Sequence, residues 1–215
     1  AGHVLDICIR ALDYCPPVDL MFGDYLRALI TADLDLVPGD ELGYRPAFVQ
    51  AFRRRGIYPS NVRNLSVESL CWEPPEVDLP LAPLFGKLRL SWDLHVDREK
   101  AFDLSRANAR AVHCWLMTDP KIRDADTETL GFHRHEQPGK VSKFEVHSVR
   151  PVRRIGPDGQ QRTDVVVEIT QSWKPGAGGS RRGGCTLLID PEKRAIRYVI
   201  RKRVGHPGRV SERGW

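Results

Sequence analysis

The stretch Lys143-Phe-Glu-Val-His-Ser-Val-Arg-Pro-Val-Arg-Arg-Ile155 is followed by Gly156-Pro157-Asp158-Gly159 and then by Arg162-Thr-Asp-Val-Val-Val-Glu-Ile-Thr-Gln-Ser-Trp173. Two runs rich in β-branched residues on either side of a Gly-Pro-Asp-Gly turn predict a β-hairpin. A second pair of runs, residues 185–190 and 195–204, flanks Pro191-Glu-Lys-Arg194 and predicts a second hairpin. We therefore expect an antiparallel sheet of about four strands in the C-terminal half.

A long helix is expected to cover this sheet. Asp97 can cap a helix that runs to about Thr118, because apolar and small side chains recur on one face at Ala101, Phe102, Ser105, Ala109, Val112 and Leu116. Residues 87–96 alternate between apolar and polar, and they fit a strand or a helix almost equally well. Residues 174–184 contain five glycines, which favours a flexible loop, either natural or a shortened junction. The second half is therefore predicted to be α+β.

The first half is predicted to be helical, with three to four helices. Residues 3–14 place Val4, Leu5, Cys8, Ala11 and Leu12 on one helical face, and Pro16-Pro17 ends that helix. Asp19 can cap a second helix with a broad apolar face. A third helix is bounded by Pro46 and Gly56, with an apolar stripe at Phe48, Ala51 and Phe52. A short helix is expected around residues 66–71.

Four prolines within residues 73–85 indicate an extended linker. The predicted organisation is a helical segment over residues 1–72, a Pro-rich linker over residues 73–85 and a basic α+β domain over residues 86–215.

Composition limits the class of protein. The 215 residues include 41% hydrophobic residues, and no apolar run approaches the roughly 18 residues needed to span a bilayer. Five cysteines are odd in number and widely spread, which favours reduced thiols in the cytoplasm. The alternative is that a longer chain supplies a disulfide partner. We expect a soluble cytoplasmic protein.

Charge divides the chain into two different parts. Residues 1–85 carry 7 Lys and Arg against 12 Asp and Glu, whereas residues 86–215 carry 26 against 16. The basic side chains of the predicted hairpins could merge into a patch for an anionic partner. They are Arg150, Arg153, Arg154, Arg197, Arg201, Lys202 and Arg203. The competing interpretation is that these side chains decorate an exposed sheet face or pair with the acidic first half.

A family resemblance rests on Ile7-Cys-Ile-Arg-Ala-Leu12, Phe22, Leu26-Arg27-Ala28, Ala51-Phe52 and Gly56-Ile57-Tyr58. In this order and spacing, residues 3–58 resemble the C-terminal helices of thermolysin-like (gluzincin) zinc metallopeptidases. The two prolines at Pro16 and Pro17 depart from the usual single proline, and the chain continues about 150 residues beyond the matched part. This continuation resembles extensions on uncharacterised bacterial metallopeptidase-like proteins.

The resemblance implies architecture but no catalytic residue. The family binds zinc through His-Glu-x-x-His and a later Glu, all of which lie upstream of the matched helices. The opening of the chain inside an apparent helix, without Met, also suggests a piece of a longer protein. We therefore expect no cofactor in this chain, with zinc only in an upstream peptidase-like region.

Three local patterns resemble functional sites, and a structural role is expected for each. Phe132-His133-Arg134-His135-Glu136 has two close histidines but no further ligand, so a solvated loop is expected. Asp33, Asp35 and Asp40-Glu41 resemble a calcium loop loosely, yet Tyr44 stands where a bidentate Glu is needed. Cys185 could act as a nucleophile with His147 or His113, but a buried thiol is the simpler expectation.

These observations lead to one primary hypothesis and one alternative. The primary hypothesis is a non-catalytic C-terminal portion of a zinc-metallopeptidase-like bacterial protein, with a structural, substrate-positioning or regulatory role. Its expected partner is the upstream peptidase-like region, with an acidic protein surface as a further candidate. The alternative is a stand-alone basic module for an acidic protein or a nucleic acid, of which the nucleic acid is disfavoured because no RNA-binding signature accompanies the basic residues.

Overall fold

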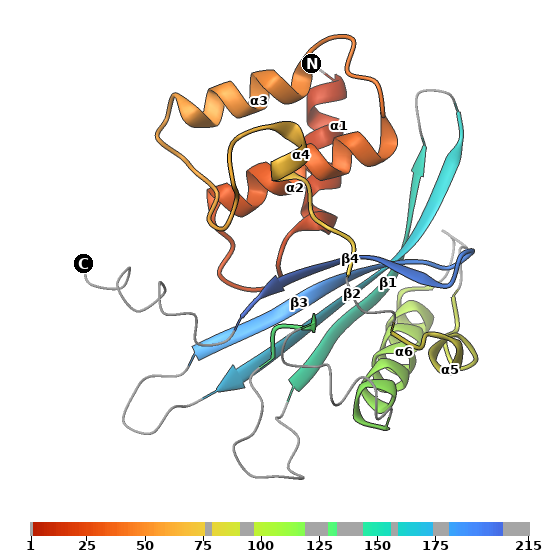
Figure 1. Cartoon of the computed structure of the whole chain (residues 1–215). Helices are drawn as coiled ribbons and strands as arrows, with labels where there is room; N and C mark the ends of the chain where they lie inside the picture. The colour runs from red at the N-terminus through yellow and green to blue at the C-terminus, as the bar shows by residue number, and fades with distance from the viewer. Residues whose placement is uncertain are drawn as a thin grey trace. The chain divides into compact units, whose positions relative to one another are not determined.

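A computed structural model describes residues 2–75, 79–90, 97–118, 129–132, 144–155, 159–173 and 181–203. Helices α1 to α4 are followed by α5 and α6 and then by four strands (Figure 1). The chain divides into two compact units. The helical unit comprises Ala1–Pro16, Leu20–Glu73 and Arg153–Thr163, and the sheet unit comprises the remainder. The expected α+β class is confirmed.

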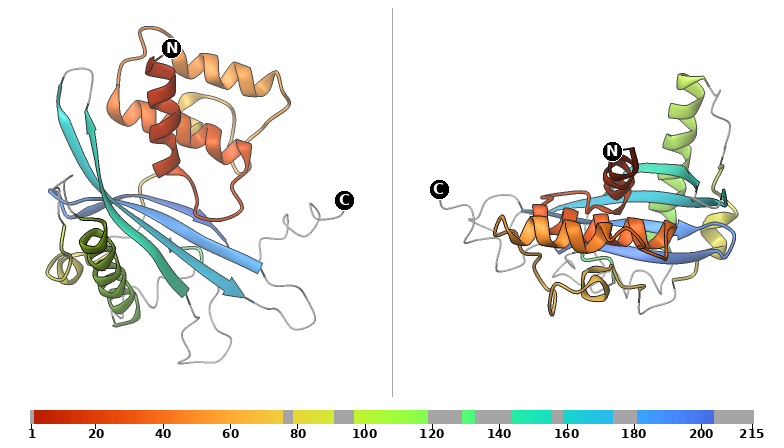
Figure 2. Two further views of the ribbon diagram at one scale, coloured as in Figure 1. Left: turned by 180° about the vertical axis from the view of Figure 1, so that it is seen from behind. Right: turned by 90° about the horizontal axis from the view of Figure 1, so that it is seen from above.

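The helical unit begins with α1 (Gly2–Ala11), which continues into a 3-10 turn, η1 (Leu12–Tyr14). The helix α2 (Phe22–Leu36) follows, and α1 packs against it. Next come α3 (Tyr44–Arg53) and the short α4 (Val67–Leu70). The resulting helical group is visible from two sides in Figures 1 and 2.

Two details of the helical unit differ from the sequence-based expectation. The buried face of α1 and η1 is formed by Ile7, Ala11 and Tyr14, each fully inaccessible, whereas Leu5 and Leu12 are exposed. The spacing could not select the buried face because α1 is apolar on two sides. Asp19 does not cap α2. Its φ is 47°, and α2 begins at Phe22, where the carboxylate of Asp24 accepts the backbone N–H of Met21 at 3.0 Å.

The core between α2, α3 and α4 is small and apolar. Leu26, Ile30 and Leu70 are fully buried at its centre, and Phe48 and Phe52 pack against them. The interhelical segment around Pro59 also lies close to α2, because a Cβ on Gly23 would come within 2.7 Å of the Pro59 Cα atom. Glycine at position 23 therefore permits this close approach of two backbones.

The sheet unit contains α5 (Ala82–Phe85), α6 (Arg98–Thr118) and a four-stranded antiparallel sheet. The strands are β1 (Phe144–Ile155), β2 (Gln161–Trp173), β3 (Arg181–Asp190) and β4 (Ala195–Lys202), in the order β1-β2-β3-β4. Both predicted hairpins are present, and β3 begins four residues earlier than predicted. The register of β2 and β3 pairs Val167 with Leu187.

The core of the sheet unit lies between α6 and one face of the sheet. Val112, Trp115 and Leu116 of α6 belong to the same buried cluster as Val167 and Leu187 of the sheet. The expected helical face was only partly correct, because Phe102 is 60% exposed while Trp115 is buried. Phe102 lies one turn from the start of α6, beyond the reach of this core.

The Pro-rich segment is more than a linker. Leu79, Leu81 and Leu84 are buried in the core of the sheet unit, and the indole N–H of Trp115 donates to the carbonyl of Pro80 at 2.8 Å. Prolines prevented a long helix here but left the leucines between them free to pack. The strand or helix expected for residues 87–96 lies partly outside the described residues, and residues 87–90 form neither.

Candidate functional site

A buried carboxylate occupies the centre of the helical unit. Asp33 of α2 is 2% exposed, and its Oδ2 atom accepts a hydrogen bond from Nε of Arg45 at 2.9 Å. Nη2 of Arg10 lies 3.8 Å from Asp33 Oδ1, and Nε2 of His3 lies 4.0 Å from the same oxygen. Helices α1, α2 and α3 each contribute to this cluster. The cluster therefore ties the three helices together electrostatically.

Arg45 also closes the loop that precedes α3. Its guanidinium donates to the carbonyl of Pro38 at 3.3 Å and contacts the carbonyl of Val37. Asp40 accepts the backbone N–H groups of Tyr44 and Arg45 at 2.8 and 2.9 Å, so it caps the first turn of α3. Asp33, Asp35 and Asp40 therefore serve the helices, and they do not converge as a calcium loop.

Arg10 is held in an unfavourable environment for a cation. Burial lowers the pKa of its guanidinium, and the nearby Asp33 carboxylate acts in the opposite direction. Nε and Nη2 of Arg10 are buried without a hydrogen-bond partner. Because both the burial and the unfilled donors are costly, the cluster is a source of specificity for this helix arrangement more than of stability.

A second polar group of the helical unit surrounds Tyr14. Its hydroxyl donates to Oδ2 of Asp35 at 2.6 Å. Arg154, which belongs to this unit, lies 5.0 Å above the Tyr14 ring and 3.5 Å from Oδ2 of Asp13. Arg154 of the expected basic patch is therefore a buried structural side chain in contact with an aspartate.

An exposed apolar stripe runs along α1 and into η1, opposite their buried face. Leu5, Ile9 and Leu12 are 60%, 56% and 58% exposed, and their spacing of four and three residues places them on one side of the helix. Ile7, Ala11 and Tyr14 repeat the same spacing on the buried side. A helix that is apolar on two faces normally packs against two partners. We call the exposed residues Leu5, Ile9 and Leu12 the α1 stripe.

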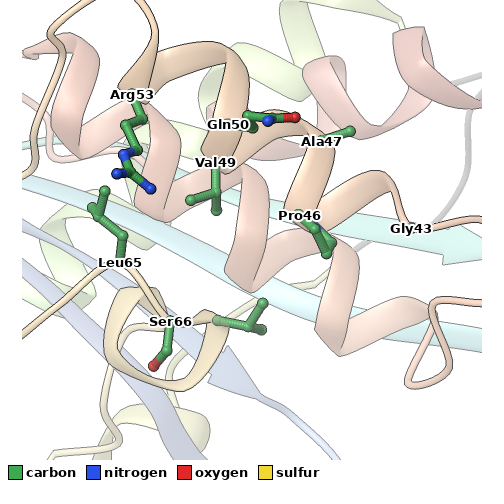
Figure 3. A pocket seen from close by; sticks show the side chains of 9 residues that line it. Gly43, Pro46, Ala47, Val49, Gln50, Arg53, Leu65 and Ser66 are labelled. Carbon is green, nitrogen blue, oxygen red and sulfur yellow. The ribbon is translucent and has the colours of Figure 1, made fainter.

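A groove lies alongside α3. It has a volume of about 680 Å³ and lies between α3 and the segment that leads into α4 (Figure 3). Its apolar lining includes Ala47, Val49 and Leu65, while Gln50 and Arg53 supply the polar side chains. A second groove, of about 450 Å³, is lined in part by Phe22 and Tyr58. Both grooves lie within the helical unit.

The expected basic patch is distributed over the sheet differently from the prediction. Arg150 lies on β1 and Arg197 and Arg201 on β4, and these strands form opposite edges of the sheet, separated by β2 and β3. Arg150 contacts Glu168 at 3.2 Å, and Arg197 contacts Asp164 at 3.0 Å. The two hairpins are neighbours in the sheet, but the arginines lie on their outer strands, β1 and β4, so that β2 and β3 separate them.

The remaining members of the predicted patch also have neighbours. Arg201 donates to the carbonyl of Thr129 at 3.3 Å, and its Cβ lies against Gly131. Arg153, Lys202 and Arg203 each make polar or electrostatic interactions as well. The arginines of the sheet therefore act in part as structural side chains, which sequence alone could not distinguish from a binding surface.

The candidate nucleophile Cys185 lies in the core. It is fully buried on β3, and burial raises the pKa of its thiol, which disfavours the reactive thiolate. Nε2 of His147 contacts Thr170 Oγ1 at 2.5 Å, and the His113 ring lies 4.8 Å from that of Phe144. Each of the two histidines thus has a neighbour other than the Cys185 thiol. All five cysteines are free.

Metal ligands do not gather in the part of the chain that the structure describes. No group of three or more His, Cys, Asp or Glu side chains there has the geometry to hold a metal ion. His133 and His135 lie outside the described residues. Among the described helices, none is long and apolar enough to cross a membrane.

Comparison with known proteins adds no relative: no protein-family model, curated protein or solved structure matches the chain. Sequence reasoning missed the α1 stripe and the α3 groove. The stripe had a signal in the second apolar spacing at Leu5, Ile9 and Leu12. The groove had none, because it depends on how residues 65–67 pack beside residues 43–53.

Proposed function

We propose that this chain is a non-catalytic portion of a zinc-metallopeptidase-like bacterial protein, in which the helical unit packs against an upstream peptidase-like region. The observation that carries the proposal is the α1 stripe. Its three large apolar side chains are more than half exposed on a helix whose opposite face is already buried. The role is structural, substrate-positioning or regulatory, and the setting is the cytoplasm, which the five free cysteines support.

Energetics favour a covering partner for the stripe. Complete burial of one leucine or isoleucine side chain contributes roughly 1.5–3 kcal/mol. Three such side chains on one helical face could therefore contribute several kcal/mol to an interface. The order of helix, proline turn, Phe-bearing helix and final helix agrees with the resemblance to the gluzincin C-terminal helices, in which the preceding region of the protein supplies the cover.

The first test concerns catalysis. The purified 215-residue chain should retain less than one equivalent of zinc after dialysis and should cleave no member of a peptide library. Zinc is expected only in the upstream region, where His-Glu-x-x-His and a later Glu would hold it and would supply a metal-activated water. One equivalent of zinc together with proteolysis by this chain alone would overturn the proposal.

The second test concerns the partner. The coding sequence that precedes Ala1 should specify His-Glu-x-x-His followed by a Glu-bearing helix. That upstream region, produced separately, should bind the chain in a pull-down assay, and Ile9→Glu should abolish binding because it places a charge in the stripe. Leu42→Glu is the matched control, since Leu42 is 78% exposed outside the stripe. Equal loss of binding in both variants, or none in either, would count against the proposal.

A further inference from the structure

We propose that the groove along α3 is a docking site for an acidic amphipathic helix of a partner protein. The site is independent of the α1 stripe and of the proposed metallopeptidase-like function. The groove is lined by Gly43, Pro46, Ala47, Val49, Gln50, Arg53, Leu65, Ser66 and Val67 (Figure 3).

The length of the groove matches a short helix. Its lining extends along α3 from Gly43 to Arg53. At a rise of about 1.5 Å per residue, this segment is roughly 15 Å long, which accommodates about three turns of a partner helix. Such a helix presents apolar anchors at positions i, i+3 or i+4, and i+7, the usual pattern of helix-in-groove recognition.

Apolar side chains form a large part of the groove lining. Val49, Leu65 and Val67 are partly buried because they pack on the core centred on Leu26, so their outer surfaces remain available at the groove. Ala47 is a small exposed side chain of α3, which leaves room for a larger side chain from a partner. A leucine or isoleucine anchor would be desolvated against these side chains.

Charge selects an acidic partner and its orientation. Arg53, Arg54 and Arg55 are exposed at the C-terminal end of α3, and Arg53 lines the groove itself. Neither Arg53 nor Arg54 makes an ion pair or side-chain hydrogen bond with any described residue. At the opposite end, Asp40 caps the helix and Glu41 is exposed.

Arg53 is thus the charged side chain of the groove lining, with Arg54 and Arg55 next to it in sequence and the acidic residues Asp40 and Glu41 preceding the other end of α3. An acidic helix should bind with its carboxylates beside Arg53, where complementary charges favour association and fix the register. Glu68 on α4 is exposed and follows Val67, which lines the groove. Its carboxylate would repel an acidic partner on the α4 side, so the partner's carboxylates should lie on the opposite side, next to Arg53 of α3. Three arginines against one glutamate leave the Arg53 end net positive.

The experiment uses two fluorescein-labelled amphipathic peptides of fourteen residues, with leucines at i, i+4 and i+7. One carries glutamates at its remaining end positions, and the other carries lysines there. Anisotropy titrations with the full chain should show saturable binding of the glutamate peptide and none of the lysine peptide. Arg53→Glu should weaken binding by about tenfold.

Two further variants separate charge from shape. Ala47→Trp should abolish binding by filling the groove. Arg63→Glu carries the same charge reversal at an exposed position that does not line the groove, and it should change affinity by less than about twofold. All variants should retain the circular dichroism spectrum and thermal midpoint of the original chain, because the substituted side chains are exposed.

Three results would overturn the proposal. They are equal binding of the two peptides, equal weakening by Arg53→Glu and Arg63→Glu, and undiminished binding by Ala47→Trp. Sedimentation that shows a dimer of this chain, dissociated by Ala47→Trp, would identify a second copy as the occupant and would likewise overturn it.

Discussion

At the scale of single residues, the buried ion pair between Asp33 and Arg45 joins α2 to α3 at 2.9 Å. Removing Arg45 leaves the buried Asp33 carboxylate with only the more distant Arg10, at 3.8 Å, and His3, at 4.0 Å, and a poorly compensated buried charge is costly. Arg45→Met should therefore lower the free energy of unfolding by about 3 kcal/mol, measured by urea denaturation.

Arg54→Met provides the control for this substitution, since Arg54 is exposed on the turn that follows α3. It should change stability by less than about 0.5 kcal/mol. A loss below about 1 kcal/mol for Arg45→Met would show that water replaces the pair at little cost.

Cys15 gives the helical unit a defined pH dependence. Burial raises the pKa of its thiol to about 12, and the nearby Asp24 and Asp13 carboxylates act in the same direction. The unfolded chain loses this proton near its ordinary value of 9.0, whereas the folded chain keeps it. The contribution of the protonated Cys15 thiol to the free energy of unfolding is thus fully present below about pH 9 and is lost as pH rises towards 12.

The measurement is urea denaturation at several pH values between 8 and 11. The free energy of unfolding should decline with pH in the original chain, and Cys15→Ala should flatten part of this decline. Cys114→Ala, which removes an exposed thiol, should leave the slope unchanged. Identical slopes for the original chain and Cys15→Ala would contradict the assignment.

At the scale of elements, the pairing of β2 with β3 requires glycine at position 184. Gly184 lies opposite Thr170, and a Cβ there would come within 2.2 Å of the Ile169 carbonyl oxygen and 3.0 Å of the Thr170 Cα atom. Gly184→Ala should therefore cost about 2 kcal/mol of stability, because both contacts involve backbone. Thermal denaturation followed by circular dichroism would measure the loss.

Gly39→Ala is the matched control, because a Cβ at Gly39 meets nothing within 4 Å and its backbone φ is not positive. This variant should be neutral or slightly stabilising. Equal midpoints for Gly184→Ala and the original chain would mean that β2 and β3 can separate at this point without cost.

Asn108 of α6 holds the backbone of the preceding segment through two hydrogen bonds. Oδ1 of Asn108 accepts the backbone N–H of Arg89 at 2.8 Å, and its Nδ2 donates to the Arg89 carbonyl at 2.9 Å. Asn108→Leu removes both hydrogen bonds at a buried position and should cost about 2 kcal/mol. Arg110→Leu, at an exposed position of the same helix, should cost less than about 0.5 kcal/mol in the same denaturation assay. An equal loss of stability in Asn108→Leu and Arg110→Leu would show that the introduced leucine, and not the loss of the Asn108 hydrogen bonds, lowers the stability.

At the scale of the whole molecule, the net charge of +5 does not by itself create a nucleic-acid surface. Arg150, Arg154 and Arg197 contact carboxylates, and their strands lie at opposite edges of the sheet. Anisotropy with a labelled DNA duplex at 0.15 M salt should therefore show no saturable binding below about 10 µM. Tight, salt-dependent binding that is lost on charge reversal at Arg201 and Arg203 would instead favour the basic binding module.

The sequence by itself determined the elements whose signals are local. The turn at Gly156-Pro157-Asp158-Gly159 and the alternation around it predicted β1 and β2, and Pro46 with Gly56 predicted the limits of α3. These predictions succeed because turn chemistry and proline geometry act within a few residues. The α+β class followed from the order of such elements.

Only the tertiary structure decided which surfaces these elements bury or leave open. Both faces of α1 are apolar, so the choice of Ile7 over Leu5 for the core depended on where α2 packs. The separation of Arg150 from Arg197 depended on the order of strands, and the α3 groove depended on Leu65 and Val67 meeting a helix that ends at Arg53. Periodicity defines the faces of one element, whereas burial and binding surfaces depend on which other element lies opposite.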